Sequence, residues 1–171
     1  GRPVTQIKPE GNTTYEYWSS SNITPIGSMK PGLGMLKSSV LSVAGNQKHK
    51  ITYDYNTFSD INQVREEFNN ETPVVKKFTY NSNGDISKKE YHTGFTLNYE
   101  YQPENGELYR ILSPSVTPGL NAELLKIEQK DAYGNIIRYK RGGTNALTTY
   151  NTYNERGFLL NSKVGTIQDI S

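Results

Sequence analysis

The side chains that could support acid–base or metal chemistry are few and scattered. His49 and His92 are the only histidines, and neither stands at a zinc-binding spacing from another histidine or a carboxylate. We expect both to be solvent-exposed. The chain contains no cysteine, which excludes disulfides and thiolate metal sites.

Motifs of nucleophilic catalysis and nucleotide binding are also missing. No Gly-x-Ser-x-Gly elbow presents a serine nucleophile. Gly32-Leu33-Gly34 lacks the third glycine of a dinucleotide loop, and no Gly-Lys-Ser/Thr occurs. We therefore expect no catalytic residue, no metal ligand and no cofactor.

Three carboxylates, Glu16, Asp54 and Glu100, stand in the middle of Tyr-x-Tyr triplets and should share the polar face of a sheet. A glycosidase needs two carboxylates about 5–9 Å apart in a cleft, but nothing in the sequence supplies that cleft. We expect solvated side chains that discourage pairing at sheet edges. The lysine pairs at 76–77 and 88–89 are interpreted likewise, as protection of edge strands.

The segment Asn81-Ser82-Asn83-Gly84-Asp85 places oxygen donors around a glycine, as calcium loops do. An EF-hand loop also needs a glutamate at its twelfth position, where this chain has His92. A tight turn explains the same residues, because asparagine bonds its own backbone and glycine accepts positive φ. We interpret the segment as a turn.

Composition indicates that strands position these residues. The chain has 171 residues, a length that suits one domain, and only 4 alanines against 17 asparagines, 15 glycines and 8 prolines. Alanine favours helices, whereas asparagine, glycine and proline favour turns. The 13 tyrosines favour strands. We predict an all-β chain with a thin, tyrosine-rich core.

One unit recurs along the chain: a tyrosine that ends a strand, a short polar turn, and an aliphatic residue that starts the next strand. We call the tyrosine, or the residue in its place, the anchor; anchors stand at 17, 55, 80, 101, 130 and 153. Ser59 takes the glycine position of one turn, and Lys130 replaces one anchor tyrosine. The residues that we expect to build the repeat are Tyr17, Tyr53, Tyr55, Tyr80, Gly84, Tyr99, Tyr101, Gly106, Gly134, Tyr153 and Gly157.

The repeat has a physical basis in alternation. Between Phe95 and Tyr101 apolar and polar residues alternate, which places Phe95, Leu97, Tyr99 and Tyr101 on one face of a strand. A lone hairpin is marginal in water. Stacked hairpins bury one another's tyrosines, so the pattern predicts a strip of successive antiparallel hairpins.

The repeated unit resembles the YD-repeat, or Rhs-repeat, family, in which Tyr-x-Tyr-Asp-x-x-Gly-x-Leu units recur. Residues 1–17 and 130–139 each look like one whole unit, and the resemblance covers nearly the whole chain. It implies a single YD-repeat β-domain over residues 1–171, with about six hairpin units in an elongated, twisted antiparallel sheet that forms part of a shell.

The resemblance also implies a non-enzymatic, structural role. YD-repeat strips spiral into hollow shells, which enclose a toxic C-terminal domain in bacterial polymorphic toxins and insecticidal toxin complexes; teneurins use a similar shell in adhesion. The expected partner is the rest of a longer repeat chain, and the expected location is extracytoplasmic, secreted or on a bacterial surface. Six units are too few to enclose a cavity, so the chain is a fragment of a shell or a short free-standing sheet on a surface protein, and we favour the fragment.

A second hypothesis is a carbohydrate- or protein-binding module. Trp18 and Tyr15 lie beside an irregular loop predicted at residues 19–36 and could stack on the rings of a surface glycan. The net charge of +2 is too small to argue for a nucleic-acid surface. No apolar run approaches the roughly 18–20 residues of a membrane span.

Three segments fit the repeat less clearly. Ile61, Val64 and Phe68 would share one face of a helix over residues 60–68, and residues 121–125 raise the same ambiguity. The repeat register favours strands at both. Two prolines predict a break over residues 113–119.

Overall fold

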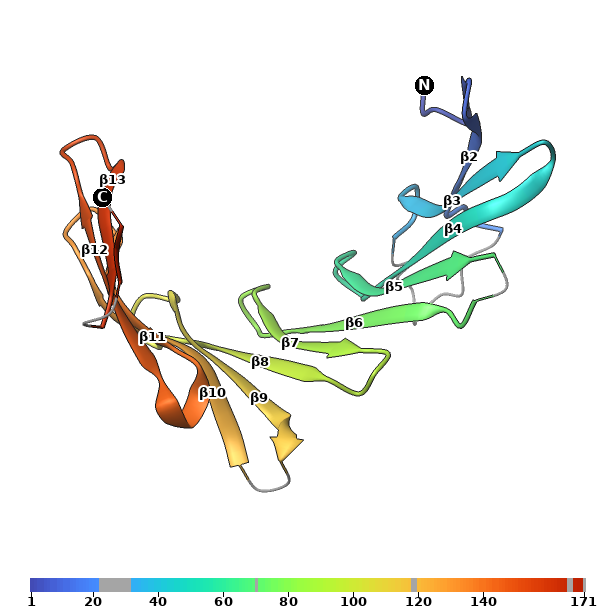
Figure 1. Cartoon of the computed structure of the whole chain (residues 1–171). Helices are drawn as coiled ribbons and strands as arrows, with labels where there is room; N and C mark the ends of the chain where they lie inside the picture. The colour runs from blue at the N-terminus through green and yellow to red at the C-terminus, as the bar shows by residue number, and fades with distance from the viewer. Residues whose placement is uncertain (22–31, 70, 118–119, 166–167, 171) are drawn as a thin grey trace. The chain divides into compact units, whose positions relative to one another are not determined.

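The computed structural model describes residues 1–21, 32–69, 71–117, 120–165 and 168–170. The chain divides into two compact units (Figure 1). Unit 1 contains Gly1–Tyr80 and Lys89–Thr93, and unit 2 contains Asn81–Lys88 and Gly94–Ser171. The expectation of a single repeat domain stays a prediction.

The described residues form strands and one short 3₁₀ helix, Gly143–Asn145 (η1), without an α-helix. The strands of unit 1 are β1 (Thr5–Lys8), β2 (Gly11–Tyr17), β3 (Leu36–Val43), β4 (Asn46–Tyr55), β5 (Ile61–Phe68) and β6 (Val74–Tyr80). Strand β7 (Ile86–Tyr91) has residues in both units. The strands of unit 2 are β8 (Thr96–Tyr101), β9 (Leu108–Thr117), β10 (Leu120–Lys130), β11 (Ile136–Arg141), β12 (Leu147–Tyr153), β13 (Leu159–Val164) and β14 (Gln168–Ile170).

Pairing follows chain order. Within each unit every strand pairs antiparallel with the strand before it, from β1 to β6 and from β8 to β14. The predicted all-β class, an antiparallel sheet of successive hairpins, is therefore confirmed. No helix in the described part of the chain is long and apolar enough to cross a membrane.

The ambiguous segments are strands. Strand β5 pairs with β4 and β6, and β10 pairs with β9 and β11, so tertiary pairing overrides the helical spacing of their apolar residues. The break predicted over residues 113–119 is wrong up to Thr117, because β9 runs on through Pro114. Residues 118–119 lie outside the described residues.

A β-bulge lies in the strand that follows the anchors at 17, 55, 101, 130 and 153. Tyr55 pairs with Ile61 but Asp54 pairs with Gln63, so Asn62 is an extra residue. An extra residue leaves the ladder locally unpaired and bends the strand. The extra residues at the other sites are Lys37, Tyr109, Ile137 and Leu160.

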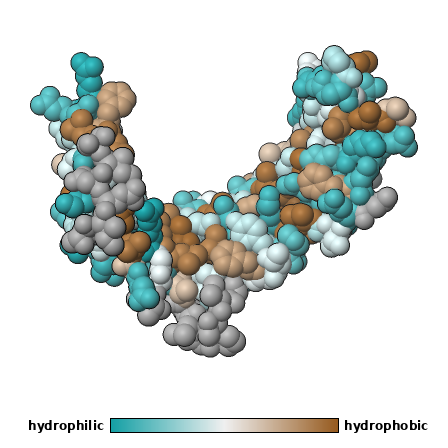
Figure 2. Space-filling view, viewed as in Figure 1, coloured by the Kyte–Doolittle hydropathy of each residue, from teal (hydrophilic) through white to brown (hydrophobic). Residues whose placement is uncertain are grey.

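The core is thin, as the composition predicts. Leu112 is the only apolar side chain among the described residues that is buried, with 7% of its surface exposed. Ser113 and Thr149 are the most deeply buried residues, and the repeat tyrosines are half-buried. On the face shown in Figure 2, apolar patches alternate with polar ones. Contacts between neighbouring hairpins therefore replace a thick core.

Candidate functional site

Four of the turns after anchors are organised by their first side chain. In the turn at residues 81–85, Asn81 Oδ1 accepts hydrogen bonds from the backbone N–H groups of Asn83 and Asp85, both at 2.9 Å. The Asn81 N–H donates to the Asp85 carbonyl at 2.9 Å. Gly84 closes the turn by donating its N–H to the Asn81 carbonyl at 3.2 Å, with φ at 87°. The oxygen atoms that suggested a calcium loop therefore shape the turn.

The same turn recurs with different residues. Asn56, Asp131 and Asn154 accept the equivalent pairs of backbone hydrogen bonds at 2.9–3.0 Å. The bonds that Asp131 accepts, chiefly from the Asn135 side chain, hold its pKa below the ordinary value. The turn at 102–107 is one residue longer and closes with a Gln102 N–H to Glu107 carbonyl bond of 2.8 Å.

The glycine position of these turns requires positive φ. Gly106, Gly134 and Gly157 have φ of 71°, 85° and 78°. Ser59 adopts φ of 69°, which is rare for a residue with a Cβ. Its Oγ accepts a hydrogen bond from the Gly32 N–H at 3.2 Å. This bond offsets part of the backbone strain and gives serine a reason to stand there.

Each anchor tyrosine is hydrogen-bonded to the preceding hairpin. The Tyr80 hydroxyl donates to the carbonyl of Ile61, the first residue of β5, at 2.6 Å. The described β5–β6 ladder ends at Gln63 and Lys77, so the hydroxyl satisfies a carbonyl beyond the ladder. We call this contact a tyrosine lock. The other locks are Tyr17 to Pro3 (3.0 Å), Tyr55 to Leu36 (2.8 Å), Tyr101 to Ile86 (2.9 Å) and Tyr153 to Ile136 (3.1 Å).

Three of the lock tyrosines lose their hydroxyl proton less readily than a free tyrosine. Burial raises the pKa of Tyr55, Tyr80 and Tyr101, and a nearby carboxylate, Asp60 for Tyr80 and Asp85 for Tyr101, raises it further. Each hydroxyl can therefore donate at neutral pH.

One anchor departs from the pattern. Lys130 precedes the turn at 131–135, and Leu108 is the first strand residue after the preceding turn. Lys130 Nζ lies 2.7 Å from Glu107 Oε2, so an ion pair with the preceding turn replaces the tyrosine lock. Both side chains are partly exposed, at 25% and 42%.

The remaining repeat tyrosines, Tyr53 and Tyr99, lie two positions before anchors and hence on the same strand face as the anchors. The Tyr53 carbonyl accepts a hydrogen bond from Trp18 Nε1 at 3.1 Å. Lys37 Nζ lies 5.0 Å from the centre of the Trp18 ring. Tyr15 donates its hydroxyl to Gln6 Oε1 at 3.2 Å. The two residues proposed for ligand stacking therefore make contacts within the chain.

The loop predicted at residues 19–36 takes the place of a turn. The Trp18 N–H donates to the Met35 carbonyl at 2.9 Å, and the Gly34 N–H donates to the Trp18 carbonyl at 2.7 Å. β3 begins at Leu36. Residues 22–31 lie outside the described residues.

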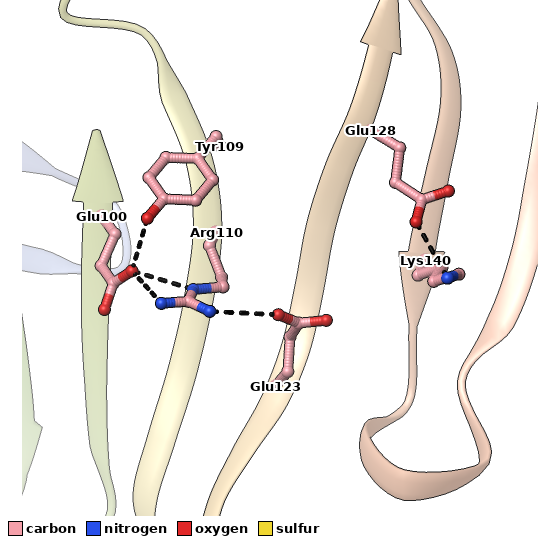
Figure 3. Close-up of polar contacts among 6 residues, drawn as sticks. All are labelled: Glu100, Tyr109, Arg110, Glu123, Glu128 and Lys140. Carbon is pink, nitrogen blue, oxygen red and sulfur yellow. Dashed lines mark hydrogen bonds and ion pairs between the residues drawn. The ribbon is translucent and has the colours of Figure 1, made fainter. Parts of the chain in front are cut away.

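The triplet carboxylates are bound to neighbouring strands, and the expectation that they protect edges is wrong. Glu100 Oε2 accepts bonds from Arg110 Nε (2.8 Å), Arg110 Nη2 (2.6 Å) and the Tyr109 hydroxyl (2.9 Å), as Figure 3 shows. Arg110 Nη1 also lies 3.6 Å from Glu123. Glu16 pairs with Lys37 at 2.7 Å, and Asp54 accepts from Gln63 at 3.0 Å.

A second carboxylate cluster involves Glu128, whose two oxygens lie 2.8 Å from Arg138 Nε and 2.9 Å from Lys140 Nζ. Figure 3 draws the contact with Lys140. A hydrogen bond from Lys140 lowers the pKa of Glu128. These cross-strand pairs follow from opposite charges facing each other across antiparallel strands.

The lysine pairs at 76–77 and 88–89 lie on β6 and β7, and their role as edge protection stays a prediction. Lys76 Nζ lies 3.2 Å from Glu66 Oε1, and Lys89 Nζ lies 5.8 Å from the Phe78 ring centre. One lysine of each pair, Lys76 and Lys89, therefore contacts a side chain on a neighbouring strand.

His49 is half-buried, whereas the sequence predicted a solvent-exposed side chain. Its ring stacks on Phe68 with centres 4.5 Å apart, and 30% of the side chain is exposed. His92 lies in an exposed turn. Among the described residues no group of three or more His, Cys, Asp or Glu side chains could hold a metal ion.

Comparisons with family models and with curated proteins found no match. Solved structures share the fold. A chain of the Photorhabdus luminescens Tc holotoxin pore, carrying an aspartate-to-alanine mutation in TccC3, matches 89% of this chain with a TM-score of 0.63 and 16% identity. A chain of a TcdB2–TccC3–Cdc42 structure matches 95% with a TM-score of 0.55 and 20% identity. A chain of TcdB2–TccC3 without the hypervariable C-terminal region matches 93% with a TM-score of 0.55 and 19% identity.

The chain spans less than a tenth of the length of these solved chains, 7%, 9% and 9% respectively. At such identities the likeness concerns the fold. It supports the YD-repeat resemblance at that level, because the matched chains belong to Tc toxins.

Proposed function

We propose that this chain is a non-enzymatic structural segment of a YD/Rhs-repeat protein and forms part of a β-sheet shell or scaffold. The observation that carries the proposal is the tyrosine lock. Five anchor tyrosines donate a hydrogen bond to a backbone carbonyl earlier in the chain. In four of them the acceptor is the first residue of a strand, and for Tyr17 it is Pro3. The most regular side-chain contacts of the molecule thus join hairpin to hairpin.

The polar chemistry of the chain supports the same proposal. Glu100, Glu123 and Glu128, the carboxylates drawn in Figure 3, are each paired with a cation on a neighbouring strand. A general acid needs a raised pKa in a cleft, whereas the Glu128 pKa is lowered. Charges used in this way stabilise a sheet and leave no acid–base pair at this site.

The likeness to segments of Tc toxin chains suggests the setting. We propose that the segment belongs to a longer repeat chain, which is its principal partner, in a secreted or cell-surface bacterial protein.

A hydrogen-exchange experiment tests the scaffold role. Tyr80→Phe deletes one lock and should speed amide exchange at the β5 start and the β6 end, while β1 to β3 keep their protection. Asn83→Ser, in an exposed turn position whose side chain makes no lock, is the matched control. Uniform loss of protection across unit 1 in Tyr80→Phe would contradict hairpin-by-hairpin locking.

A glycan array separates this proposal from the binding-module hypothesis. A scaffold segment should give no reproducible glycan signal. A signal confirmed by calorimetry and lost in Trp18→Phe, which keeps an aromatic ring but lacks the indole N–H bonded to Tyr53, would replace the scaffold role.

A further inference from the structure

A groove of about 220 Å³ lies beside Lys130, the one anchor that is not a tyrosine. Its lining is mainly polar: Gln102, Glu107, Glu128, Gln129 and Lys130 surround two apolar side chains, Leu108 and Ile127, and Glu107 is bonded to the Lys130 ammonium group. The groove lies entirely within unit 2.

The order of turn, strand start and anchor relates this groove to the place that a tyrosine ring fills at other anchors, although β10 has an extra residue, Glu128, before its anchor. Tyr80 lies against Ile61, the first residue of β5, and its pKa responds to Asp60, the last residue of the preceding turn. Leu108 and Glu107 hold these same two positions relative to Lys130. The Leu108 carbonyl thus corresponds to the Ile61 carbonyl, and among the described residues no side-chain hydroxyl donates to it.

Lysine leaves the groove open because it lacks a ring. Its ammonium group is held by Glu107 at 2.7 Å, and its four-carbon stem is thinner than a phenol. An apolar cavity of about 150 Å³ is large enough to bind benzene. The groove therefore has room for one six-membered ring.

We propose that this groove is a binding site for a small para-substituted phenol, which supplies the ring that the chain lacks. The ring packs against Leu108 and Ile127, and the hydroxyl donates to the Leu108 carbonyl as the locks do elsewhere. This binding site goes beyond the proposed scaffold role, and an experiment can contradict either proposal without contradicting the other.

The test is a titration of the full 171-residue chain with p-cresol, followed by amide chemical shifts. Shifts should be confined to residues 102, 107–108 and 127–130, with a dissociation constant on the order of 1–10 mM for so small a ligand. Toluene, which has the same ring and methyl group but no hydroxyl, should bind about 5-fold more weakly because it cannot donate a hydrogen bond.

Two substitutions of Lys130 test the site in opposite directions. Lys130→Tyr should fill the groove and abolish the p-cresol shifts, whereas Lys130→Ala should enlarge it and strengthen binding. Equal binding of toluene, shifts elsewhere on the chain, or p-cresol binding that survives Lys130→Tyr would overturn the proposal. A dimer that forms with rising protein concentration and is dissociated by p-cresol would also overturn the proposal. In that case a tyrosine of a second copy of the chain would occupy the groove.

Tyr101→Ala provides an independent readout if Lys130→Tyr does not fold. It empties the equivalent place beside Ile86, whose carbonyl accepts the Tyr101 hydroxyl in the native chain. Added p-cresol should raise the melting temperature of Tyr101→Ala more than that of the native chain, and toluene should do so less. An equal rise with both compounds would contradict the role assigned to the hydroxyl.

Discussion

Unit 2 contains two kinds of joint between hairpins. At the Tyr101 joint a half-buried phenol donates to the Ile86 carbonyl at 2.9 Å. At the Lys130 joint an ammonium group pairs with Glu107 at 2.7 Å, and both side chains are partly exposed. In each joint a bulge lies in the strand that follows the turn, but the turn after Tyr101 is one residue longer than the turn after Lys130, and β10 has an additional extra residue, Glu128, just before its anchor.

The two anchor side chains should stabilise their joints by different amounts. A tyrosine removes a ring from water and satisfies a backbone carbonyl, whereas a partly exposed ion pair contributes only about 0.2–1 kcal/mol. The lysine keeps the register of the repeat but gives a weaker joint.

Truncating both anchors should give the largest contrast. Tyr101→Ala should lower the free energy of unfolding by roughly 2–4 kcal/mol, because it removes a packed ring and leaves the Ile86 carbonyl without its donor. Lys130→Ala should cost less than about 1 kcal/mol. Urea denaturation of both variants measures the contrast, and equal losses would mean that the two joints are equivalent.

Replacing Lys130 by tyrosine should reduce the difference in stability between the two joints. Lys130→Tyr should raise the free energy of unfolding by about 1 kcal/mol, or the melting temperature by roughly 2–4 °C. Lys130→Phe, which brings the ring without the hydroxyl, is the control and should gain less. Calorimetry that shows the same gain for both would assign the effect to ring burial alone.

Salt should distinguish the joints by a smaller amount. Raising sodium chloride from 0.05 to about 1 M screens exposed charges, so Lys130→Met should lose its small stability deficit relative to the native chain. The deficit of Tyr101→Phe should persist, because its lost hydrogen bond is uncharged. A salt-independent Lys130→Met deficit would show that the lysine acts through its stem.

Alkaline pH should have the smallest effect. The folded-state pKa of Tyr101 is raised above its unfolded value of about 10. The folded state therefore binds this proton more tightly, and the resulting stability is present below about pH 10 and lost as pH rises through the folded pKa. Denaturation midpoints between pH 9 and 11 should fall less steeply in Tyr101→Phe, and parallel curves would exclude this linkage.

Sequence patterns predicted the elements of the joints well but not their contacts. The anchors at 55, 80, 101 and 153 each end a strand, and Gly84 lies in a turn with positive φ. The acceptor carbonyls were not foreseen. They depend on bulges, such as the one at Asn62, and on the register between hairpins, and neither can be recognised from the residues near the anchor.

The same limit explains the errors. Asp54 and His49 were expected at edges or in solvent, since charged and polar residues usually lie there. Both instead contact a neighbouring strand, Asp54 through Gln63 and His49 through Phe68. Which residue faces another across a sheet depends on register, and single-strand alternation does not encode it.

Alternation and turn chemistry act over fewer than about ten residues, so the residues alone predict the strands, the turns and the positions of the anchors. The folded sheet was needed to show that Tyr80 bonds a carbonyl 19 positions away, and that Lys130 pairs with Glu107 beside a groove. A strand's alternation is local, whereas the alignment of one hairpin on the next is fixed by bulges and contacts that form only when the sheet assembles.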